Sequence, residues 1–154
     1  MVVNNLPYSA ISGNSRQNSG AHNGVSEVTF RLSQRSLSRL EGVHPDLVKV
    51  VRRAIELTTV DFMVTEGLRT RERQRQLVNA GASRTMNSRH ITGHAVDVAA
   101  LVDGEVRWDW PLYATISKAF KQAANELGVP ITWGGDWKSF RDGPHYEIPR
   151  ASGR

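Results

Sequence analysis

The sequence predicts a single α+β domain in which a small antiparallel sheet packs against helices. Three observations carry this prediction. The chain has 154 residues, 39% of them hydrophobic, which is enough for one domain with a buried core. Two segments have the apolar spacing of long amphipathic helices, and several short segments have the composition of strands. Short strands separated by turns favour an antiparallel sheet beside the helices.

The apolar spacing indicates two packed helices with a polar one between them. The first covers residues 45–58, with Pro45 in its first turn. The polar helix covers residues 71–80, capped by Thr70 and ended by Gly81. The last covers residues 111–127 and ends at Gly128. The two apolar stripes are Leu47, Val50, Val51, Ala54 and Ile55, and Leu112, Ile116, Ala119, Phe120, Ala123 and Leu127.

Strand signals occupy most of the remaining chain. Residues 28–40 are expected to begin as a short strand and to end as a helical turn. Further strands are expected over residues 61–67, 95–101, 106–108, 131–133 and 145–148. Asp103-Gly104 is typical of the turn of a hairpin, which joins the second and third of these strands.

The two ends of the chain lack such patterns. Residues 1–26 are rich in Asn, Ser and Gly, so we expect residues 1–27 to form a flexible leader in which His22 has no role. The folded domain is then expected over residues 28–150, with a tail at 151–154. The sequence contains no run of 18 apolar residues and no evident secretion signal, so we expect neither membrane insertion nor export by a cleaved peptide.

The chain is basic and contains no cysteine. Twenty Lys and Arg against fifteen acidic residues give a net charge of +5, which favours polyanionic partners. No nucleic-acid-binding motif accompanies this charge, so nucleic-acid binding is not expected and is kept only as a distant alternative. Without thiolates, any metal site must be built from His, Asp and Glu.

Three such residues have the character of zinc ligands. His90 and Asp97 are seven residues apart, too far along a helix or a straight strand to share one ion, so the chain must fold back between them. Gly93 permits that turn. His145 supplies a third ligand type. Two histidines and one carboxylate leave a fourth position for water, as in a catalytic zinc site.

The strand over residues 95–101 would present Asp97 on one face. Because side chains alternate along a strand, Ala95 and Ala99 share that face and leave room for a metal and a substrate. Val96 and Val98 then point into a core.

A second histidine pattern remains open. His90 and His94 are four residues apart, as in a helical zinc motif, but that motif requires a glutamate where this chain has Ile91. His94 is therefore expected beside the site or on the surface, with ligation as the alternative.

Two further residues have the chemistry of catalysis. Asp142 lies three residues before His145, so a tight turn would bring it near the attacking water as a base. Its alternative role is that of a turn former, since Asp-Gly sequences favour turns. Arg69 is our candidate for stabilising the oxyanion, although composition alone does not distinguish it from a surface arginine.

The combined motifs resemble a known family. The motifs are Ser88-x-His90-x-x-Gly93-x-Ala95-x-Asp97, then Trp133-Gly-Gly-Asp-Trp-Lys-Ser-Phe140, then Asp142-Gly-Pro-His145. They resemble the zinc D,D-peptidase-like peptidoglycan peptidases, and most of all the L-alanyl-D-glutamate endopeptidases of phage endolysins.

The resemblance implies a hedgehog/D,D-peptidase-like fold and one zinc ion at His90, Asp97 and His145. It also implies Asp142 as the catalytic acid or base and Arg69 as the residue that polarises the scissile carbonyl. Supporting roles follow for Gln74, which is expected to face the cleft, for Ser88 behind the metal ligands, and for Glu147, which shares a strand face with His145. His94 is expected among the residues around the site.

The function implied is zinc-dependent hydrolysis of peptidoglycan stem peptides at the L-Ala–D-Glu bond by a monomer. Such a lysin is expected to accumulate in the host cytoplasm and to reach the periplasm and cell wall after a separate pore-former, a holin, opens the membrane. Two alternatives stay open: a D-Ala-D-Ala carboxypeptidase or dipeptidase, and a non-enzymatic binding module that contains zinc. Other divalent ions also suit this ligand set.

Overall fold

The computed structural model describes residues 29–150, so the expected leader and tail lie outside the described residues. In chain order the helices are α2 (Gln34–Arg39), α3 (Pro45–Leu57), α4 (Arg71–Asn79) and α5 (Trp110–Leu127), and the short helix η1 covers Gly134–Asp136. The strands are β1 (Asp61–Glu66), β2 (Ala95–Val102), β3 (Glu105–Arg107), β4 (Thr132–Trp133) and β5 (His145–Glu147). The α+β prediction is confirmed, and from residue 45 onward each expected element is present within a residue or two.

The strands form one antiparallel sheet in the order β1-β2-β5-β4, and β3 pairs with β2 outside this path. The β2–β3 hairpin turns at Asp103 and Gly104, which both have positive φ angles of 53° and 82°. Two successive positive φ angles are the signature of a tight two-residue hairpin turn. The sheet therefore places β2 between β1 and β5, with its residues facing partners on both sides.

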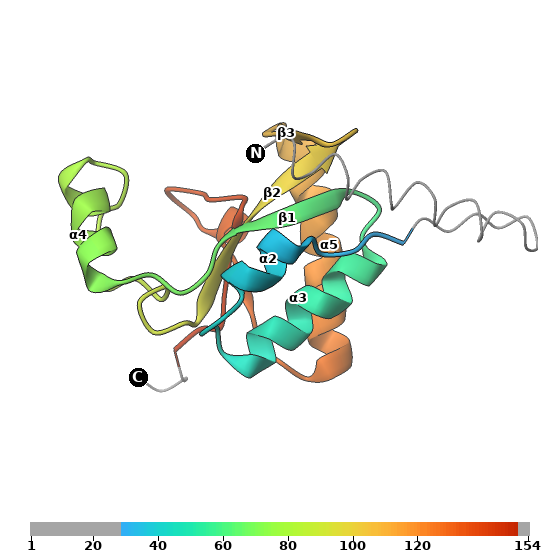
Figure 1. Ribbon diagram of the computed structural model, residues 1–154, viewed down its shortest axis with the longest axis horizontal. Coiled ribbons are helices and arrows are strands. Elements are labelled where there is room, and N and C mark those ends of the chain that lie inside the picture. Colours follow the sequence, from blue (N-terminus) through green and yellow to red (C-terminus); the bar gives the residue numbers. More distant parts are fainter. Residues whose placement is uncertain (1–28, 151–154) are drawn as a thin grey trace, which may run out of the picture.

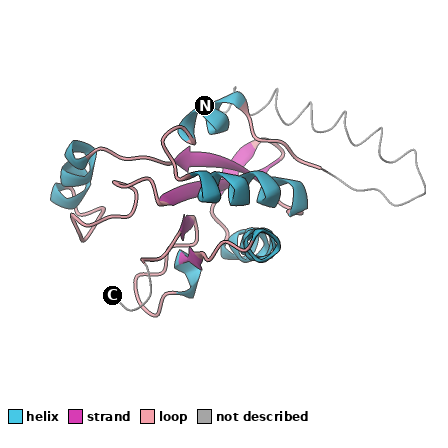
Figure 2. Ribbon diagram, turned by 90° about the horizontal axis from the view of Figure 1, so that it is seen from below, coloured by secondary structure: helices cyan, strands magenta, loops and turns pink. Residues whose placement is uncertain are grey.

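Helices α3 and α5 lie side by side on one face of the sheet (Figures 1 and 2). Their apolar stripes, apart from the exposed Leu127, pack on Phe62, Val64, Val96, Val98 and Ala100 to form the main core. The Phe120 ring of α5 stacks on the Tyr146 ring of β5 with their centroids 3.7 Å apart. A second, smaller cluster on the other face contains Met63, Ala99 and Leu101.

The prediction of a strand at the start of the folded part was wrong. Residues 29–33 form no strand, and the chain enters α2 after Ser33, whose hydroxyl accepts a hydrogen bond from the Ser36 amide. Phe30 and Leu32 pack against the main core from an extended segment, which explains their alternation without strand pairing. Helix α2 instead closes the exposed edge of β1, because the Ser36 hydroxyl accepts from the Val64 amide and Arg39 donates to the Val64 carbonyl.

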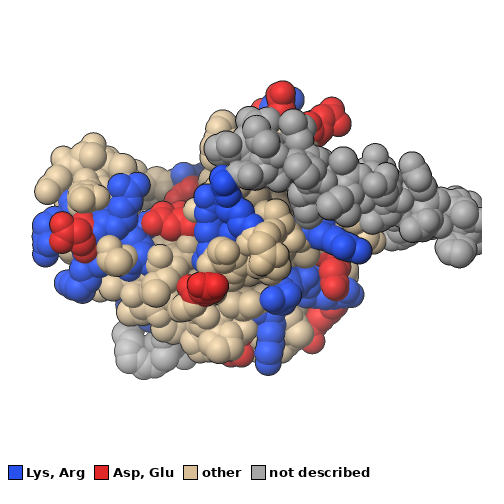
Figure 3. All heavy atoms as spheres, viewed as in Figure 1, with Lys and Arg blue, Asp and Glu red and all other residues tan. Residues whose placement is uncertain are grey.

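Helix α4 extends away from the rest of the domain (Figure 1). The Thr70 hydroxyl caps it by accepting from the Arg73 amide at 3.0 Å, as expected. Lys and Arg side chains gather over this helix in Figure 3, and its sequence contributes Arg71, Arg73 and Arg75. Among the described residues no helix is long and apolar enough to span a bilayer.

Candidate metal centre and active-site cleft

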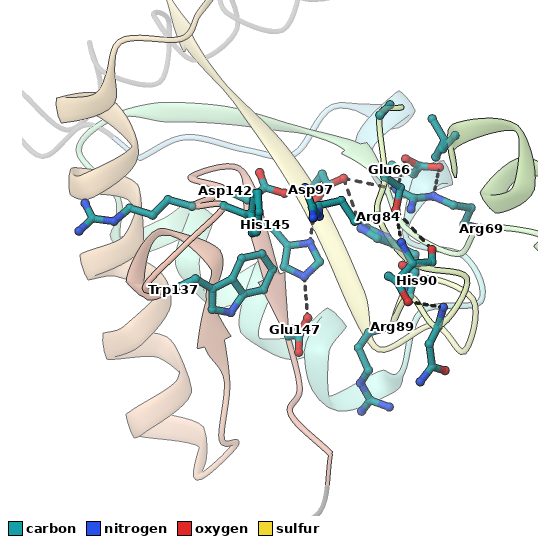
Figure 4. Close-up of a pocket in the computed structure, with 18 of the residues that line it drawn as sticks. Glu66, Arg69, Arg84, Arg89, His90, Asp97, Trp137, Asp142, His145 and Glu147 are labelled. Carbon is teal, nitrogen blue, oxygen red and sulfur yellow. Dashed lines mark hydrogen bonds and ion pairs between the residues drawn. The ribbon is translucent and has the colours of Figure 1, made fainter. Parts of the chain in front are cut away.

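A cleft of about 850 Å³ opens at the end of the sheet where β1 ends and β2 begins, beside β5. One wall comes from residues 66–69 and from the loop that follows α4, and the other wall from residues 137–147. Figure 4 shows Asp97 between His145 and His90 within it. The ionisable residues that line the cleft are Glu66, Arg69, Arg84, Arg89, His90, Asp97, Arg141, Asp142, His145, Glu147 and Arg150.

The register of the sheet aligns three of these residues in one row. Asp97 on β2 lies directly opposite His145 on β5, and opposite Glu66 on β1 on its other side. Side chains of directly opposed residues on one face lie close together. The pairing of β1 with β2 shifts between Val64 and Glu66, an irregularity of the kind often found near active sites. The sheet thus brings Asp97 and His145 together across 48 residues of sequence.

A compact turn delivers His90 to the same point. The Ser88 hydroxyl accepts from the His90 amide at 3.1 Å, and the His90 carbonyl accepts from the Arg69 amide at 2.9 Å. Gly93 has φ +79°, and a Cβ there would lie 2.5 Å from the carbonyl oxygen of Gly42. The position therefore requires glycine, which agrees with the predicted reversal of the chain.

The rings of His90 and His145 lie edge to face with centroids 5.2 Å apart, and neighbouring groups orient each of them. Nδ1 of His90 is 2.8 Å from the Gly67 carbonyl and donates to it, which leaves Nε2 as the ring nitrogen that faces Asp97. This Nε2 is buried without a hydrogen-bond partner, although Oδ2 of Asp97 lies 3.3 Å away. His145 places Nε2 2.7 Å from Glu147 and Nδ1 3.1 Å from Oδ1 of Asp97.

This geometry fits a divalent metal ion. His90, Asp97 and His145 offer ligand atoms that all lie within 4.8 Å of one another. A buried nitrogen without a partner is costly in a folded protein, and a metal ion would satisfy Nε2 of His90. The carbonyl at Gly67 and the carboxylate of Glu147 hold the outer ring nitrogens, an arrangement that typically supports metal-bound histidines. The group could therefore hold a metal ion.

The electrostatics of the group favour a bound cation. Burial alone would raise the pKa of the Asp97 carboxyl, but the hydrogen bond from His145 and the nearby His90 ring lower it far below its usual range. Burial alone would lower the pKa of His145, but its bonds to Asp97 and Glu147 raise it to about 9. The site thus keeps an ionised carboxylate and already attracts a positive charge, here a proton, between Asp97 and His145.

Asp142 lies in the same cleft, on the turn that leads into β5. Its backbone is fixed at both ends, because its amide donates to the Gly134 carbonyl at 3.0 Å and its carbonyl accepts from the His145 amide at 3.1 Å. Burial, followed by the negative charge of Asp97, raises the pKa of the Asp142 carboxyl. A carboxylate with a raised pKa beside a candidate metal site has the properties of a general base.

Arg69 is held at the edge of the group by two partners. Its Nε and Nη2 donate to Glu66 at 2.9 and 2.6 Å, and its Nη1 donates to Gln74 at 2.7 Å. Nη2 also lies 3.7 Å from Oδ2 of Asp97. The guanidinium is therefore fixed next to the ligands, as a residue that polarises a substrate carbonyl must be.

The expectation that Gln74 faces the cleft was wrong. Gln74 is fully buried and does not line the cleft. Its side-chain amide donates to the Ser83 hydroxyl at 2.8 Å and to the Thr85 carbonyl at 2.5 Å, while its oxygen accepts from Arg69. The loop after α4 folds over the helix and covers Gln74, so its role is to support Arg69 and that loop.

His94 lies outside the cleft and outside the metal group. Its ring stands 5.1 Å from the His44 ring, and its Nδ1 is 2.7 Å from the Thr92 hydroxyl. The turn at Gly93 directs His90 and His94 to different sides of the chain. The helical pattern that would pair these two histidines is absent, because residues 89–93 form turns rather than a helix.

Sequence reasoning missed several residues of the cleft. Glu66 orients Arg69, but its only signal was an acidic residue three positions before an arginine, which is common. The Trp137 ring stands 5.1 Å from the His145 ring, and its only signal was membership of the Trp133–Phe140 motif. Arg84 and Phe140 meet across the cleft from distant segments, and no sequence spacing indicates that contact.

Comparison with known proteins adds an independent finding. The profile of the family described as "Phage L-alanyl-D-glutamate peptidase" matches residues 28–151. An L-alanyl-D-glutamate peptidase of Escherichia phage T5 is 37% identical over 129 residues, which cover 81% of this chain and 93% of that protein. A peptidoglycan L-alanyl-D-glutamate endopeptidase of Bacillus subtilis, CwlK, is 32% identical and covers 58% of this chain and 61% of its own length.

A solved structure agrees with these relatives. The L-Ala D-Glu endopeptidase ChiX of Serratia marcescens superposes with a TM-score of 0.75 at 50% sequence identity. The match covers 79% of this chain and 91% of that one. At 50% identity the likeness extends beyond the fold to the sequence.

Proposed function

Because this chain belongs to the phage L-alanyl-D-glutamate peptidase family, we propose that it hydrolyses peptidoglycan stem peptides at the L-Ala–D-Glu amide bond, with one zinc ion held by His90, Asp97 and His145. It is a peptidoglycan peptidase of the phage endolysin type. The observation that carries the proposal is the convergence of three ligand side chains beside Asp142 in one cleft.

Zinc suits this ligand set among the divalent ions. Two imidazoles and one carboxylate, with a fourth position open to the cleft, are typical of catalytic zinc. Bound there, zinc would polarise the scissile carbonyl and lower the pKa of a water molecule. Both effects would act on a peptide that enters from the cleft.

The residues of the chain would then carry the proton and the charge. Asp142 takes a proton from the attacking water, whose oxygen bonds to the carbonyl carbon of L-alanine. Asp142 then returns the proton to the D-glutamyl nitrogen, and the carbon–nitrogen bond breaks. Arg69, fixed by Glu66 and Gln74, donates to the carbonyl oxygen as negative charge develops on it.

The remaining proposals concern the setting of the enzyme. We propose a monomer whose catalytic domain covers residues 28–150, preceded by a leader over residues 1–27 and followed by a tail over 151–154. The enzyme would collect in the host cytoplasm and act in the periplasm on the cell wall after a holin has opened the membrane.

Product analysis tests the proposal. Purified protein loaded with zinc is incubated with peptidoglycan, and the fragments are identified by mass spectrometry. We expect fragments that begin with D-glutamate, and we expect loss of activity on chelation that added zinc restores. Release of single D-alanine would instead identify a carboxypeptidase, and an absence of products would contradict hydrolysis.

The variant Asp142→Asn tests the role of the proposed base. Asparagine keeps the two backbone hydrogen bonds of this position but cannot accept the proton. We expect turnover to fall by about 10² to 10⁴ with zinc affinity retained, the range found for loss of general acid–base catalysis. Unchanged turnover in this variant would leave Asp142 with a purely structural role in its turn.

A further inference from the structure

An arginine and an aromatic residue meet across the cleft. Arg84 comes from the loop after α4, and Phe140 from the loop between η1 and β5, so the two belong to opposite walls. The guanidinium carbon of Arg84 lies 4.0 Å from the centroid of the Phe140 ring. Arg84 is drawn among the residues that line the cleft in Figure 4. This pair spans the cleft in which the metal group and Asp142 lie.

The loop around Arg84 is tied to the rest of the domain, and Phe140 has an unusual backbone conformation. The residues on either side of Arg84 are tied to Gln74, whose amide donates to the Ser83 hydroxyl and to the Thr85 carbonyl. Gln74 also accepts from Arg69, so the loop that carries Arg84 is connected to the metal group through two side chains. Phe140 has φ +53° and is 66% exposed, an unusual backbone conformation for a bulky residue and one often found at functional sites.

The charge of Arg84 is not matched by a carboxylate. Arg69 in the same cleft is paired with Glu66, but no ion pair is found for Arg84 among residues 29–150. Its guanidinium instead lies over the face of the Phe140 ring. A cation–π contact orients a guanidinium and leaves its N–H groups able to donate in the ring plane. Arg84 is therefore a positioned cation without a counter-ion.

The substrate of the proposed function carries a suitable counter-ion. A D-glutamyl residue has two carboxyl groups, and a peptide chain continues through only one of them, so one carboxylate stays free on the residue that carries the scissile nitrogen. That nitrogen must face Asp142, which returns the proton to it. Phe140 lies two residues before Asp142 and holds the Arg84 guanidinium on that same wall.

The geometry points to Arg84 as a specificity-determining residue that binds the free carboxylate of the D-glutamyl residue, with Phe140 as its positioning partner. This inference rests on the proposed function. Arg69 acts on the scissile carbonyl, whereas Arg84 acts on the residue that follows the bond. A planar guanidinium is well suited to a carboxylate because it can donate two parallel hydrogen bonds.

The test compares two substrates that differ only in this carboxylate. One is a disaccharide stem peptide with the free D-glutamyl carboxyl, and the other is its counterpart with that carboxyl amidated. Amidation keeps the shape and removes the charge. We expect the zinc-loaded enzyme to show a kcat/KM about tenfold to a hundredfold higher for the free acid, as a charge-assisted contact allows. We expect Arg84→Gln to reduce this ratio toward one, mainly through KM for the acid.

Two variants control the experiment. Arg75→Gln removes the same charge from an exposed position on α4 that does not line the cleft, and it should keep the ratio of the unaltered enzyme. Phe140→Ala keeps Arg84 but removes its positioning partner, and it should lower the ratio less than Arg84→Gln does. Arg84→Lys should restore part of the preference, because lysine retains the charge without the planar fork.

The outcomes separate the inference from the function on which it rests. If Arg84→Gln slows both substrates equally, or if the unaltered enzyme does not distinguish them, Arg84 does not read the carboxylate and the peptidase assignment stands. If the unaltered enzyme cleaves neither substrate at the L-Ala–D-Glu bond, the proposed function fails and this inference fails with it.

Discussion

Strand β2 presents Val96, Val98 and Ala100 to one face of the sheet and Asp97 to the other. The first three side chains are buried beneath α3 and α5 in the main core. Asp97 instead faces the cleft, where it contacts two histidines and lies near Arg69. Adjacent residues of one strand thus meet opposite requirements, burial without polar groups on one face and a concentration of charge on the other.

This difference shows which information each face needs. The core face is defined by a repeating pattern, since any apolar residue of suitable size serves there. The cleft face depends on register, because a shift of one residue between β2 and β5 would place Asp97 opposite a residue other than His145. Variants of the two faces should therefore fail in different ways.

The largest effect is expected from Asp97→Asn. Asparagine fits the same space but cannot supply the charge that attracts a cation, so we expect zinc affinity to fall steeply. Activity should fall by at least about a thousandfold, because several kcal/mol of stabilisation of the reacting groups depend on the ion. The far-ultraviolet circular dichroism spectrum should stay unchanged, since the core face is untouched. Isothermal titration with zinc and stem-peptide turnover measure both effects, and retained zinc binding would contradict the assignment of Asp97 as a ligand.

The same distinction explains how much of the molecule the sequence predicts. The periodic spacing of apolar residues predicts helices α3 and α5. The distance between His90 and Asp97 predicts a reversal of the chain at Gly93, because only a turn can bring the two together. The convergence of His145 with Asp97 had no spacing signal. Only the family motif predicts this convergence, and the pairing of β2 with β5 explains it.

The failures have the same physical origin. The alternation of Phe30 and Leu32 reflects packing against the core, but strand formation also requires a paired neighbour, and α2 occupies the edge of β1. The family resemblance implies that Gln74 faces the cleft, but the loop carrying Ser83 and Thr85 covers it. Contacts made by loops depend on the path of the chain, which periodicity does not encode.

The next effect concerns competition between a metal ion and a proton on the cleft face. In the metal-free protein the pKa of His145 is raised from 6.5 to about 9. The raised value means that protonated His145 stabilises the fold fully below pH 6.5 and that this stabilisation is lost as the pH rises through about 9. The size of this shift corresponds to a loss of roughly 3 kcal/mol. Zinc bound at His145 would replace this proton, so the stability of the zinc-loaded protein should change little with pH.

Denaturant unfolding at pH 6.5 and at pH 9.5, with and without zinc, measures this difference. Glu147→Gln is the matched variant, because Glu147 is one of the two groups that raise the pKa of His145. We expect it to reduce the dependence on pH in the metal-free protein. A metal-free protein whose stability rises over this range would contradict the assignment of the proton to His145.

The smallest effect is expected from Val98→Ala, on the residue next to Asp97. Val98 is fully buried in the main core, and alanine would remove two carbon atoms and leave a small cavity. We expect the free energy of unfolding to fall by about 2 kcal/mol. The backbone hydrogen bond from the Val98 amide to the Pro144 carbonyl is retained, so the turn that carries Asp142 stays attached to β2. Turnover per folded molecule and zinc affinity should therefore stay within about twofold of the unaltered enzyme, because the charges of the cleft face are unchanged. A loss of zinc affinity as large as that of Asp97→Asn would mean that the two faces of β2 do not act independently and that core packing itself sets the metal geometry.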